Sequence, residues 1–277
     1  MLPQKPGPIG VFDSGYGGLT ILKEIKKILP DYDYLYLGDN ARTPYGTRSF
    51  EIVYKFTLQA VERLFKEGCH LVILACNTAS AKALRSIQVH DLPSLDVNRR
   101  VLGVIRPTVE RLNQITNSKH IGVLATPGTV FSQSYPLEIA KLFPEIQVAS
   151  EACPMWVPLV EYDEANKKGA DYFVKQHIIN ILNQDQLIDT LILGCTHYPL
   201  LLPKIKQHTP NHIHIISQGE YVANSLKEYL TRHPQVEAKC TKGGSSNYYT
   251  TESTKKFIES ASIFLNEKIT VKQITLD

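Results

Sequence analysis

The chain has 277 residues, 43% of them hydrophobic, and its 30 Lys and Arg against 27 Asp and Glu give a formal net charge of +3. This length is enough for one large domain or two linked ones, and the balanced charge argues against a nucleic-acid-binding protein. The longest apolar runs span only a few residues, as in residues 71–75, so no membrane span is expected. The N-terminal residues lack the apolar core of a signal peptide, and we expect a cytoplasmic protein.

The five cysteines are odd in number and scattered, at Cys69, Cys76, Cys153, Cys195 and Cys240. None shows the C-x-x-C spacing of a zinc site or a dithiol redox centre. In a reducing compartment all five should be free thiols.

Short apolar runs of strand character alternate with amphipathic stretches of helical periodicity. In chain order the first part reads strand 9–12, helix 19–29, strand 34–37, helix 49–67, strand 71–75 and helix 79–87. The alternation resumes with strand 121–124, helix 169–182, strand 190–193 and helix 200–208. This pattern predicts βαβ units around parallel sheets, and the turn-rich stretch 91–100 is the best candidate for a domain boundary.

A comparison of the chain with itself reveals two matched strand ends. Residues 9–15 (IGVFDSG) parallel residues 121–127 (IGVLATP), a strand that runs into a small turn. Residues 71–78 (LVILACNT) parallel residues 190–197 (TLILGCTH). Each half therefore presents a cysteine at the carboxyl end of a buried strand.

Ligands of open α/β sheets bind beyond the carboxyl ends of the strands, so two such halves facing each other place Cys76 and Cys195 around one cleft. The alternative is that both are core residues, because free cysteine is among the most buried residue types. Their matching positions, each followed by an amide or hydroxyl residue, favour a function.

After each cysteine the chain is predicted to turn into a helix, with Asn77 and Thr78 following Cys76 and Thr196 following Cys195. A helix N-terminus offers free N–H groups and positive potential, which lower a thiol pKa and attract a carboxylate. The following residues are also ordinary capping residues, and the two roles are compatible.

Residues 13–18 (DSGYGG) lie between a predicted strand and a predicted helix, where dinucleotide-binding loops occur. The spacing is not G-x-G-x-x-G, and Asp13 would place a negative charge beside a pyrophosphate. Asp13 better suits a cationic group or a proton relay, although a turn or cap is the commoner use of aspartate.

Three further features carry polar groups beside predicted strands. The loop 38–46 (GDNARTPYG) is rich in polar residues and turn formers, as both functional and ordinary loops are. Glu161 ends the apolar run 152–161 (ACPMWVPLVE), either as a surface residue or as a carboxylate held near a site. His197 either tunes the thiol two residues before it or is a hydrogen-bonded structural histidine.

Five blocks, in the family's order, resemble glutamate racemase: DSGYGG at 13–18, GDNARTPYG at 38–46, ACNTAS at 75–80, ACPMWVPLVE at 152–161 and GCTHYPLL at 194–201. The resemblance implies an α/β fold of two pseudo-symmetric doubly wound domains with parallel sheets and an active site in the cleft between them. We assign residues 1–103 with 216–277 to the first domain and residues 104–215 to the second. No pyridoxal phosphate or other cofactor and no metal is implied, and the product D-glutamate would serve bacterial peptidoglycan.

The same resemblance implies residue roles. Cys76 and Cys195 form the acid/base pair, with Asp13 assisting the first and His197 with Glu161 assisting the second. The implied substrate contacts are Asp13, Ser14, Pro44, Tyr45, Gly46, Asn77, Thr78, Thr129, Thr196 and His197. Racemisation needs a base on one face of Cα and an acid on the other, so a thiolate and a thiol suffice if local dipoles stabilise the carbanion.

The expected partners are L- and D-glutamate and a second copy of the chain in a homodimer, with no nucleic acid and no membrane. The stretch 91–100 is longer than the family's usual connection into the second domain. Two other functions fit the residues: a sister racemase acting on aspartate or a hydantoin, and a two-domain binding protein whose cysteines are merely buried. Substrate assays separate the racemases, and proton exchange at Cα excludes simple binding.

Overall fold

Buried apolar runs form the strands of two separate sheets, in which every paired strand is parallel. The computed structural model describes residues 4–265 and 268–276. The first sheet has the order β10-β9-β2-β1-β3-β4 and consists of β1 (Ile9–Asp13), β2 (Tyr34–Gly38), β3 (Leu71–Leu74), β4 (Arg100–Gly103), β9 (Ser246–Thr250) and β10 (Val271–Gln273). The second has the order β6-β5-β7-β8 and consists of β5 (His120–Ala125), β6 (Gln147–Ala152), β7 (Thr190–Gly194) and β8 (His214–Ile216).

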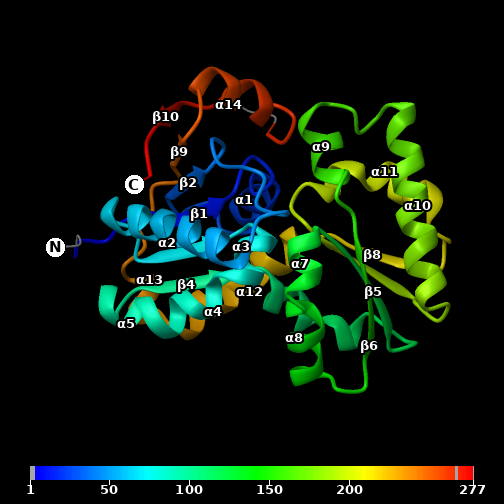
Figure 1. The fold of residues 1–277 in the computed structure, drawn as a ribbon. Helices are drawn as coiled ribbons and strands as arrows, with labels where there is room; N and C mark the ends of the chain where they lie inside the picture. The colour runs from blue at the N-terminus through cyan, green and yellow to red at the C-terminus, as the bar shows by residue number, and fades with distance from the viewer. Residues whose placement is uncertain (1–3, 266–267, 277) are drawn as a thin grey trace.

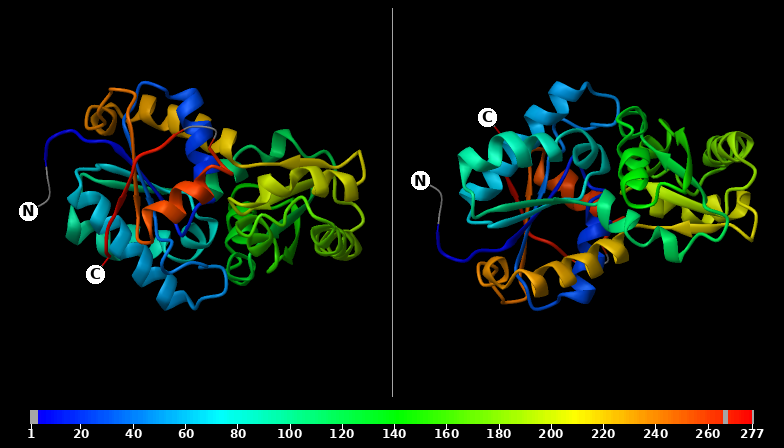
Figure 2. Two further views of the ribbon diagram at one scale, coloured as in Figure 1. Left: turned by 90° about the horizontal axis from the view of Figure 1, so that it is seen from above. Right: turned by 90° about the horizontal axis from the view of Figure 1, so that it is seen from below.

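Helices surround each sheet, so that the molecule has two lobes placed side by side (Figures 1 and 2). The first lobe contains α1 (Leu19–Ile28), α2 (Phe50–Lys66), α3 (Asn77–Lys82), α4 (Leu84–Ser86), the π-helical turn η1 (Ile87–Asp91), α5 (Leu92–Leu95), α12 (Gly219–Arg232), α13 (Pro234–Glu237) and α14 (Thr254–Ala261). The second contains α6 (Ile105–Val109), the 3-10 helix η2 (Leu112–Gln114), α7 (Pro127–Phe131), α8 (Ser134–Leu142), α9 (Trp156–Glu161), α10 (Lys168–Gln184), the 3-10 helix η3 (Tyr198–Leu201) and α11 (Leu202–His208). Among the described helices, none has both the length and the apolar character needed to cross a bilayer.

The two sheets repeat one arrangement of strands. The order β2-β1-β3-β4 in the first lobe matches β6-β5-β7-β8 in the second. Within these sets Phe12 pairs with Leu74, and Leu124 pairs with Leu193 at the corresponding place. The predicted fold of two pseudo-symmetric α/β units with parallel sheets is therefore confirmed.

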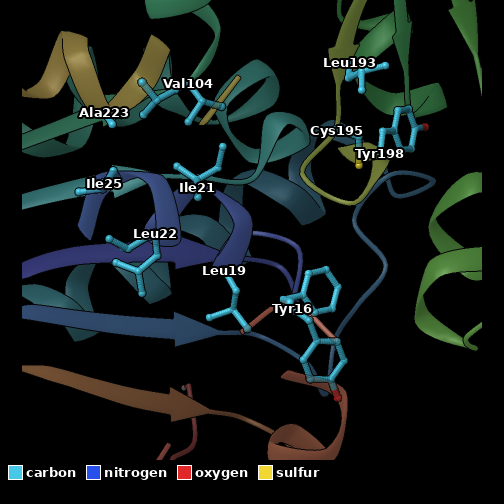
Figure 3. Close-up of a cluster of buried hydrophobic side chains, with 14 of the residues drawn as sticks. Tyr16, Leu19, Ile21, Leu22, Ile25, Val104, Leu193, Cys195, Tyr198 and Ala223 are labelled. Carbon is cyan, nitrogen blue, oxygen red and sulfur yellow. The ribbon is translucent and has the colours of Figure 1, made fainter. Parts of the chain in front are cut away.

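Alternation along the strands separates the buried side chains into different cores, because successive strand residues point to opposite faces. On β1, Val11 joins a cluster with α1 and α12, whereas Phe12 joins a cluster under α2 and α3. The cluster that contains Val11 also includes Tyr16, Val104 and Cys195, and it extends into the core of the second lobe. Figure 3 shows part of it, with α1 side chains beside Val104. The lobes thus share a packed junction.

The stretch 91–100 is not the boundary between the lobes. Helical geometry continues through η1 and α5, and Arg100 opens β4, which pairs with β3 in the first sheet. Arg99 is fully buried and donates hydrogen bonds to the carbonyl oxygens of Phe65 and Cys69, which fixes the segment against the end of α2. Its turn-forming residues suggested a linker, but this buried guanidinium binds the segment to the first lobe.

The chain crosses between the lobes after β4 and again after β8. All strands before residue 104 or after residue 245 lie in the first sheet, and the strands of residues 120–216 lie in the second. This distribution supports the domain limits 1–103 with 216–277 and 104–215 to within one residue, since Ile216 still belongs to β8, and we keep these limits as a proposal. Residues 1–3, 266–267 and 277 of those ranges lie outside the described residues.

Candidate active site

Cys76 lies two residues after the end of β3 and caps α3. The Ala79 N–H donates to Cys76 Sγ at 3.5 Å, and the thiol donates to Ser14 Oγ at 3.5 Å. Burial and the neighbouring Asp13 carboxylate raise the pKa of the Cys76 thiol to about 12. The lowered pKa that a helix N-terminus suggested is therefore wrong for Cys76, because burial outweighs the end of a six-residue helix.

Asp13 ends β1 beside Cys76 and is fully buried. Its carboxylate accepts the Gly15 N–H at 2.9 Å and the Thr196 hydroxyl at 3.4 Å. Burial raises the pKa of the Asp13 carboxyl, although the positive charge of His197 opposes the rise. Asp13 of the first lobe thus interacts directly with the loop that follows Cys195 in the second.

Cys195 lies directly after β7, the strand equivalent to β3. The helix predicted after Cys195 begins at Tyr198 as η3, two residues before the predicted start at 200, with His197 at its N-cap position. Tyr198 is buried, and its hydroxyl donates to the Cys153 carbonyl at 3.1 Å, which holds the turn in place. Figure 3 shows Cys195 beside Tyr198.

His197 connects Cys195 to Glu161. Its Nδ1 lies 3.9 Å from Cys195 Sγ and its Nε2 lies 3.1 Å from Glu161 Oε1. Burial lowers the pKa of His197, but the hydrogen bonds to Cys195 and Glu161 outweigh this and raise it to about 10. A protonated His197 can donate from both ring nitrogens, to Cys195 Sγ and to Glu161 Oε1.

The two thiols occupy one junction between the lobes. Gly17 packs so closely on the Cys195 turn that an added Cβ would lie 2.3 Å from Thr196 Oγ1 and 2.4 Å from His197 Nδ1. The charge of Cys195 also contributes to the raised pKa of Cys76. Each cysteine is only 6% exposed, so both thiols lie inside the closed junction.

A cluster of threonine hydroxyls joins the lobes on the Cys76 side. Thr78 Oγ1 lies 2.9 Å from Thr126 Oγ1 and 3.3 Å from Thr129 Oγ1. Thr126 also caps α7. The structure therefore brings the predicted Thr78 and Thr129 together and adds Thr126, which the self-comparison aligned with Ser14.

The predicted loop 38–46 contacts the second lobe through its last residue. The Gly46 carbonyl accepts the Gly128 N–H at 2.7 Å. The buried Tyr45 donates its hydroxyl to the Asp39 carboxylate. Pro44 is exposed and Gly46 half-buried, whereas the other predicted substrate contacts are buried.

Comparison with known proteins identifies the family. The sequence profile of Asp/Glu/Hydantoin racemase matches residues 9–226. The chain belongs to the Asp/Glu/Hydantoin racemase family. Within the family, the glutamate racemase of Ruegeria sp. (strain TM1040) is 40% identical over 272 residues, which cover 95% of this chain and 98% of that protein.

Solved structures of family members have the same fold. A glutamate racemase isoform from Bacillus anthracis has a TM-score of 0.89 and 36% identity, covering 99% of each chain. Glutamate racemase from Francisella tularensis in complex with D-glutamate has a TM-score of 0.87 and 33% identity, covering 98% of each chain. The resemblance predicted from the five sequence blocks is confirmed.

Three side chains around the thiols were missed by the sequence analysis. Tyr135 and Gln218 hydrogen-bond to Asn77, and the Phe264 ring meets His197 edge-on at 5.8 Å between centroids. They come from distant segments whose local pattern is that of ordinary helices and loops. Within residues 4–265 and 268–276, no three His, Cys, Asp or Glu side chains gather in a way suited to a metal ion.

Proposed function

We propose that this protein is a glutamate racemase that interconverts L- and D-glutamate by two-base proton transfer between Cys76 and Cys195, without a cofactor. The observation that carries the proposal is the pair of thiols at equivalent strand ends of two facing lobes. The many relatives named glutamate racemase, matched over nearly their whole length, support glutamate as the substrate. The D-glutamate bound to the Francisella tularensis protein supports a small amino-acid ligand.

The partners of the two thiols differ, and the difference suggests their roles in the conversion of L- to D-glutamate. Cys76 lies beside a carboxylate and its pKa is raised to about 12, so it rests as a thiol. Cys195 lies beside His197, whose pKa is raised to about 10, so a positive charge stands next to the sulfur that acts as the base in this proposal. Cys195 then removes the Cα proton, and Cys76 delivers its own proton to the opposite face of the carbanion. The two cysteines exchange protonation states in each conversion.

The direction of transfer follows by analogy with the family: Cys195 acts on L-glutamate and Cys76 on D-glutamate. Asp13 assists Cys76, while His197 with Glu161 assists Cys195. In this proposal the substrate is held by Asp13, Ser14, Pro44, Tyr45, Gly46, Asn77, Thr78, Thr129, Thr196 and His197. Hydroxyl and amide donors of this set suit the α-carboxylate, onto which the carbanion charge delocalises.

Substrate entry requires the lobes to move apart, because the side chains of both cysteines are almost entirely covered. A closed junction suits the chemistry, since excluding water strengthens each interaction with the developing charge. We further propose a cytoplasmic role in supplying D-glutamate for peptidoglycan, and a homodimer, both of which rest on the family resemblance.

The test is incubation of each glutamate enantiomer in deuterated water without added cofactor. Interconversion with deuterium at Cα of the product is expected, because the acid is a solvent-exchangeable thiol. Cys76→Ala and Cys195→Ala should each lower turnover by at least about 100-fold. Cys240→Ala is the matched control, since this thiol is also buried but donates to the Val236 carbonyl, away from the junction.

Full turnover in either Cys76→Ala or Cys195→Ala would contradict the two-base assignment. Faster racemisation of L-aspartate or of a 5-substituted hydantoin would support a racemase reaction but contradict glutamate as its substrate. Ligand binding without any Cα exchange would instead identify a binding protein.

A further inference from the structure

Three buried side chains form a closed ring of hydrogen bonds next to Cys76. Asn77 Nδ2 donates to Gln218 Oε1 at 2.7 Å, Gln218 Nε2 donates to Tyr135 OH at 2.7 Å, and Tyr135 OH donates to Asn77 Oδ1 at 2.8 Å. All three residues are no more than 2% exposed. Asn77 belongs to the first lobe, Tyr135 to the second, and Gln218 to the segment that returns to the first.

A backbone carbonyl fixes the direction of this ring. Gln218 Nε2 lies 3.2 Å from the Val104 carbonyl oxygen, in the segment where the chain first crosses between the lobes. A carbonyl can only accept, so the Gln218 amide must turn its NH₂ towards Val104 and its oxygen towards Asn77. Asn77 must then present its NH₂ to Gln218 and accept from Tyr135. Reversing the Asn77 amide would set its oxygen against the Gln218 oxygen, two acceptors with no hydrogen between them.

The fixed direction decides what Asn77 offers to a ligand. Its oxygen is occupied by Tyr135, and one of its two Nδ2 hydrogens is occupied by Gln218. The second Nδ2 hydrogen remains available to an acceptor. Beside Cys76 this makes Asn77 a donor, which suits a substrate carboxylate, whereas a flipped amide would oppose the carboxylate with a lone pair.

We propose that Gln218 and Tyr135 are positioning residues that hold the Asn77 amide in its donor orientation toward the substrate carboxylate. This inference rests on the proposed racemase function and deepens it. Because the ring takes members from both lobes and from the crossing segment, it is complete only when the lobes adopt this relative orientation. Carboxylate binding and lobe closure are thereby coupled through Asn77.

The test compares two variants that break the ring with a matched control. Gln218→Met keeps the length of the side chain but removes its polar atoms, and Tyr135→Phe removes one oxygen. Each should lower kcat/KM for both enantiomers by about 10- to 100-fold, because a buried amide loses its partner and its fixed direction. Gln88→Met is the control: Gln88 Nε2 also donates to a carbonyl of β4, Val101 O at 2.7 Å, outside the ring. It should change kcat/KM by less than about 2-fold.

A double-mutant cycle separates positioning from a general structural role. If Gln218 acts through Asn77, then Gln218→Met should lower kcat/KM by less than about 3-fold in an Asn77→Ala background.

The pH profile of Gln218→Glu provides a second readout. A neutral carboxylic acid can donate once and accept from Asn77, but the carboxylate can only accept. The variant should therefore retain activity at low pH and lose it as the new carboxyl ionises, adding a descending limb to the pH profile that the wild type lacks.

Equal losses from Gln218→Met in the wild-type and Asn77→Ala backgrounds would overturn the positioning role, as would a Gln218→Glu profile parallel to that of the wild type. Activity within 2-fold of the control in both Gln218→Met and Tyr135→Phe would also overturn it. A wild type that racemises neither enantiomer would instead refute the proposed function on which the inference rests.

Discussion

Replacing Glu161 with Gln tests how His197 is kept protonated beside Cys195. Glu161 Oε1 lies 3.1 Å from His197 Nε2, with the two side chains 18% and 5% exposed. Burial lowers the pKa of His197, and the bonds to Cys195 and Glu161 together raise it to about 10. Glu161→Gln keeps the size of the side chain but removes the charge, so burial is opposed less strongly and the pKa of His197 should fall.

A hydrogen bond to a charged group contributes about 1.5–3 kcal/mol, and one pKa unit corresponds to about 1.4 kcal/mol. The imidazolium is the active form and is present below its pKa, so activity is lost as the pH rises through that pKa. In the wild type this alkaline limb of kcat/KM is expected near pH 10. In Glu161→Gln it should lie about one to two pH units lower.

The assay follows the interconversion of glutamate enantiomers by circular dichroism from neutral pH to about pH 11. Glu151→Gln is the matched control, because Glu151 Oε1 also pairs with a histidine, His177 Nδ1 at 2.7 Å, in the same lobe. An alkaline limb that stays in place in Glu161→Gln, or one that moves equally in both variants, would refute the reasoning.

Two further predictions concern acid stability and the packing on His197. Burial raises the pKa of Asp189, but hydrogen bonds from Ser118 N–H, Thr116 and their neighbours outweigh it and lower that pKa to about 2. The contribution of Asp189 to stability is full above the ordinary pKa of 3.8 and is lost as the pH falls through about 2. Asp189→Asn should therefore lower the free energy of unfolding near neutral pH by about 2 kcal/mol, and in urea titrations that free energy should depend less on pH in acid than it does in the wild type. Unchanged stability at neutral pH would contradict this. Phe264→Ala removes the ring on His197 and should lower kcat/KM by about 3- to 10-fold. Phe131→Ala, at an 82% exposed ring, is the control, and equal kinetics in the two variants would exclude this role for Phe264.

The central strands could be predicted from sequence because they are buried on both faces. Residues 9–12 and 71–74 are uniformly apolar or glycine, and the structure places them in β1 and β3, inside the first sheet. Two strands escaped notice for the opposite reason: β6 at the edge of its sheet, and β9, which lies next to the edge strand β10. β6 has the sequence QVASEA and no fully buried residue, and β9 contains Ser246 and Asn247, so neither shows a continuous apolar run.

Part of the site followed from the repeat within the sequence. Two halves with the same strand order must place equivalent strand ends at equivalent positions, and the thiols stand at those ends. The protonation of the thiols did not follow. A helix N-terminus predicted a lowered pKa for Cys76, but burial and Asp13 raise it to about 12. Desolvation depends on all the surrounding chain, which a local motif does not report.

The sequence by itself determined the two α/β halves, the position of a cysteine at the end of one strand in each, and the family, because these depend on local periodicity and on contiguous motifs. Only the tertiary structure decided which way the Asn77 amide points, how Glu161 reaches His197 and where Phe264 packs. Those contacts join segments up to 141 residues apart, as between Asn77 and Gln218, and two of them, Tyr135 with Asn77 and Phe264 with His197, join the two lobes. Pairing over such distances is set by packing of the whole fold, which no single segment specifies.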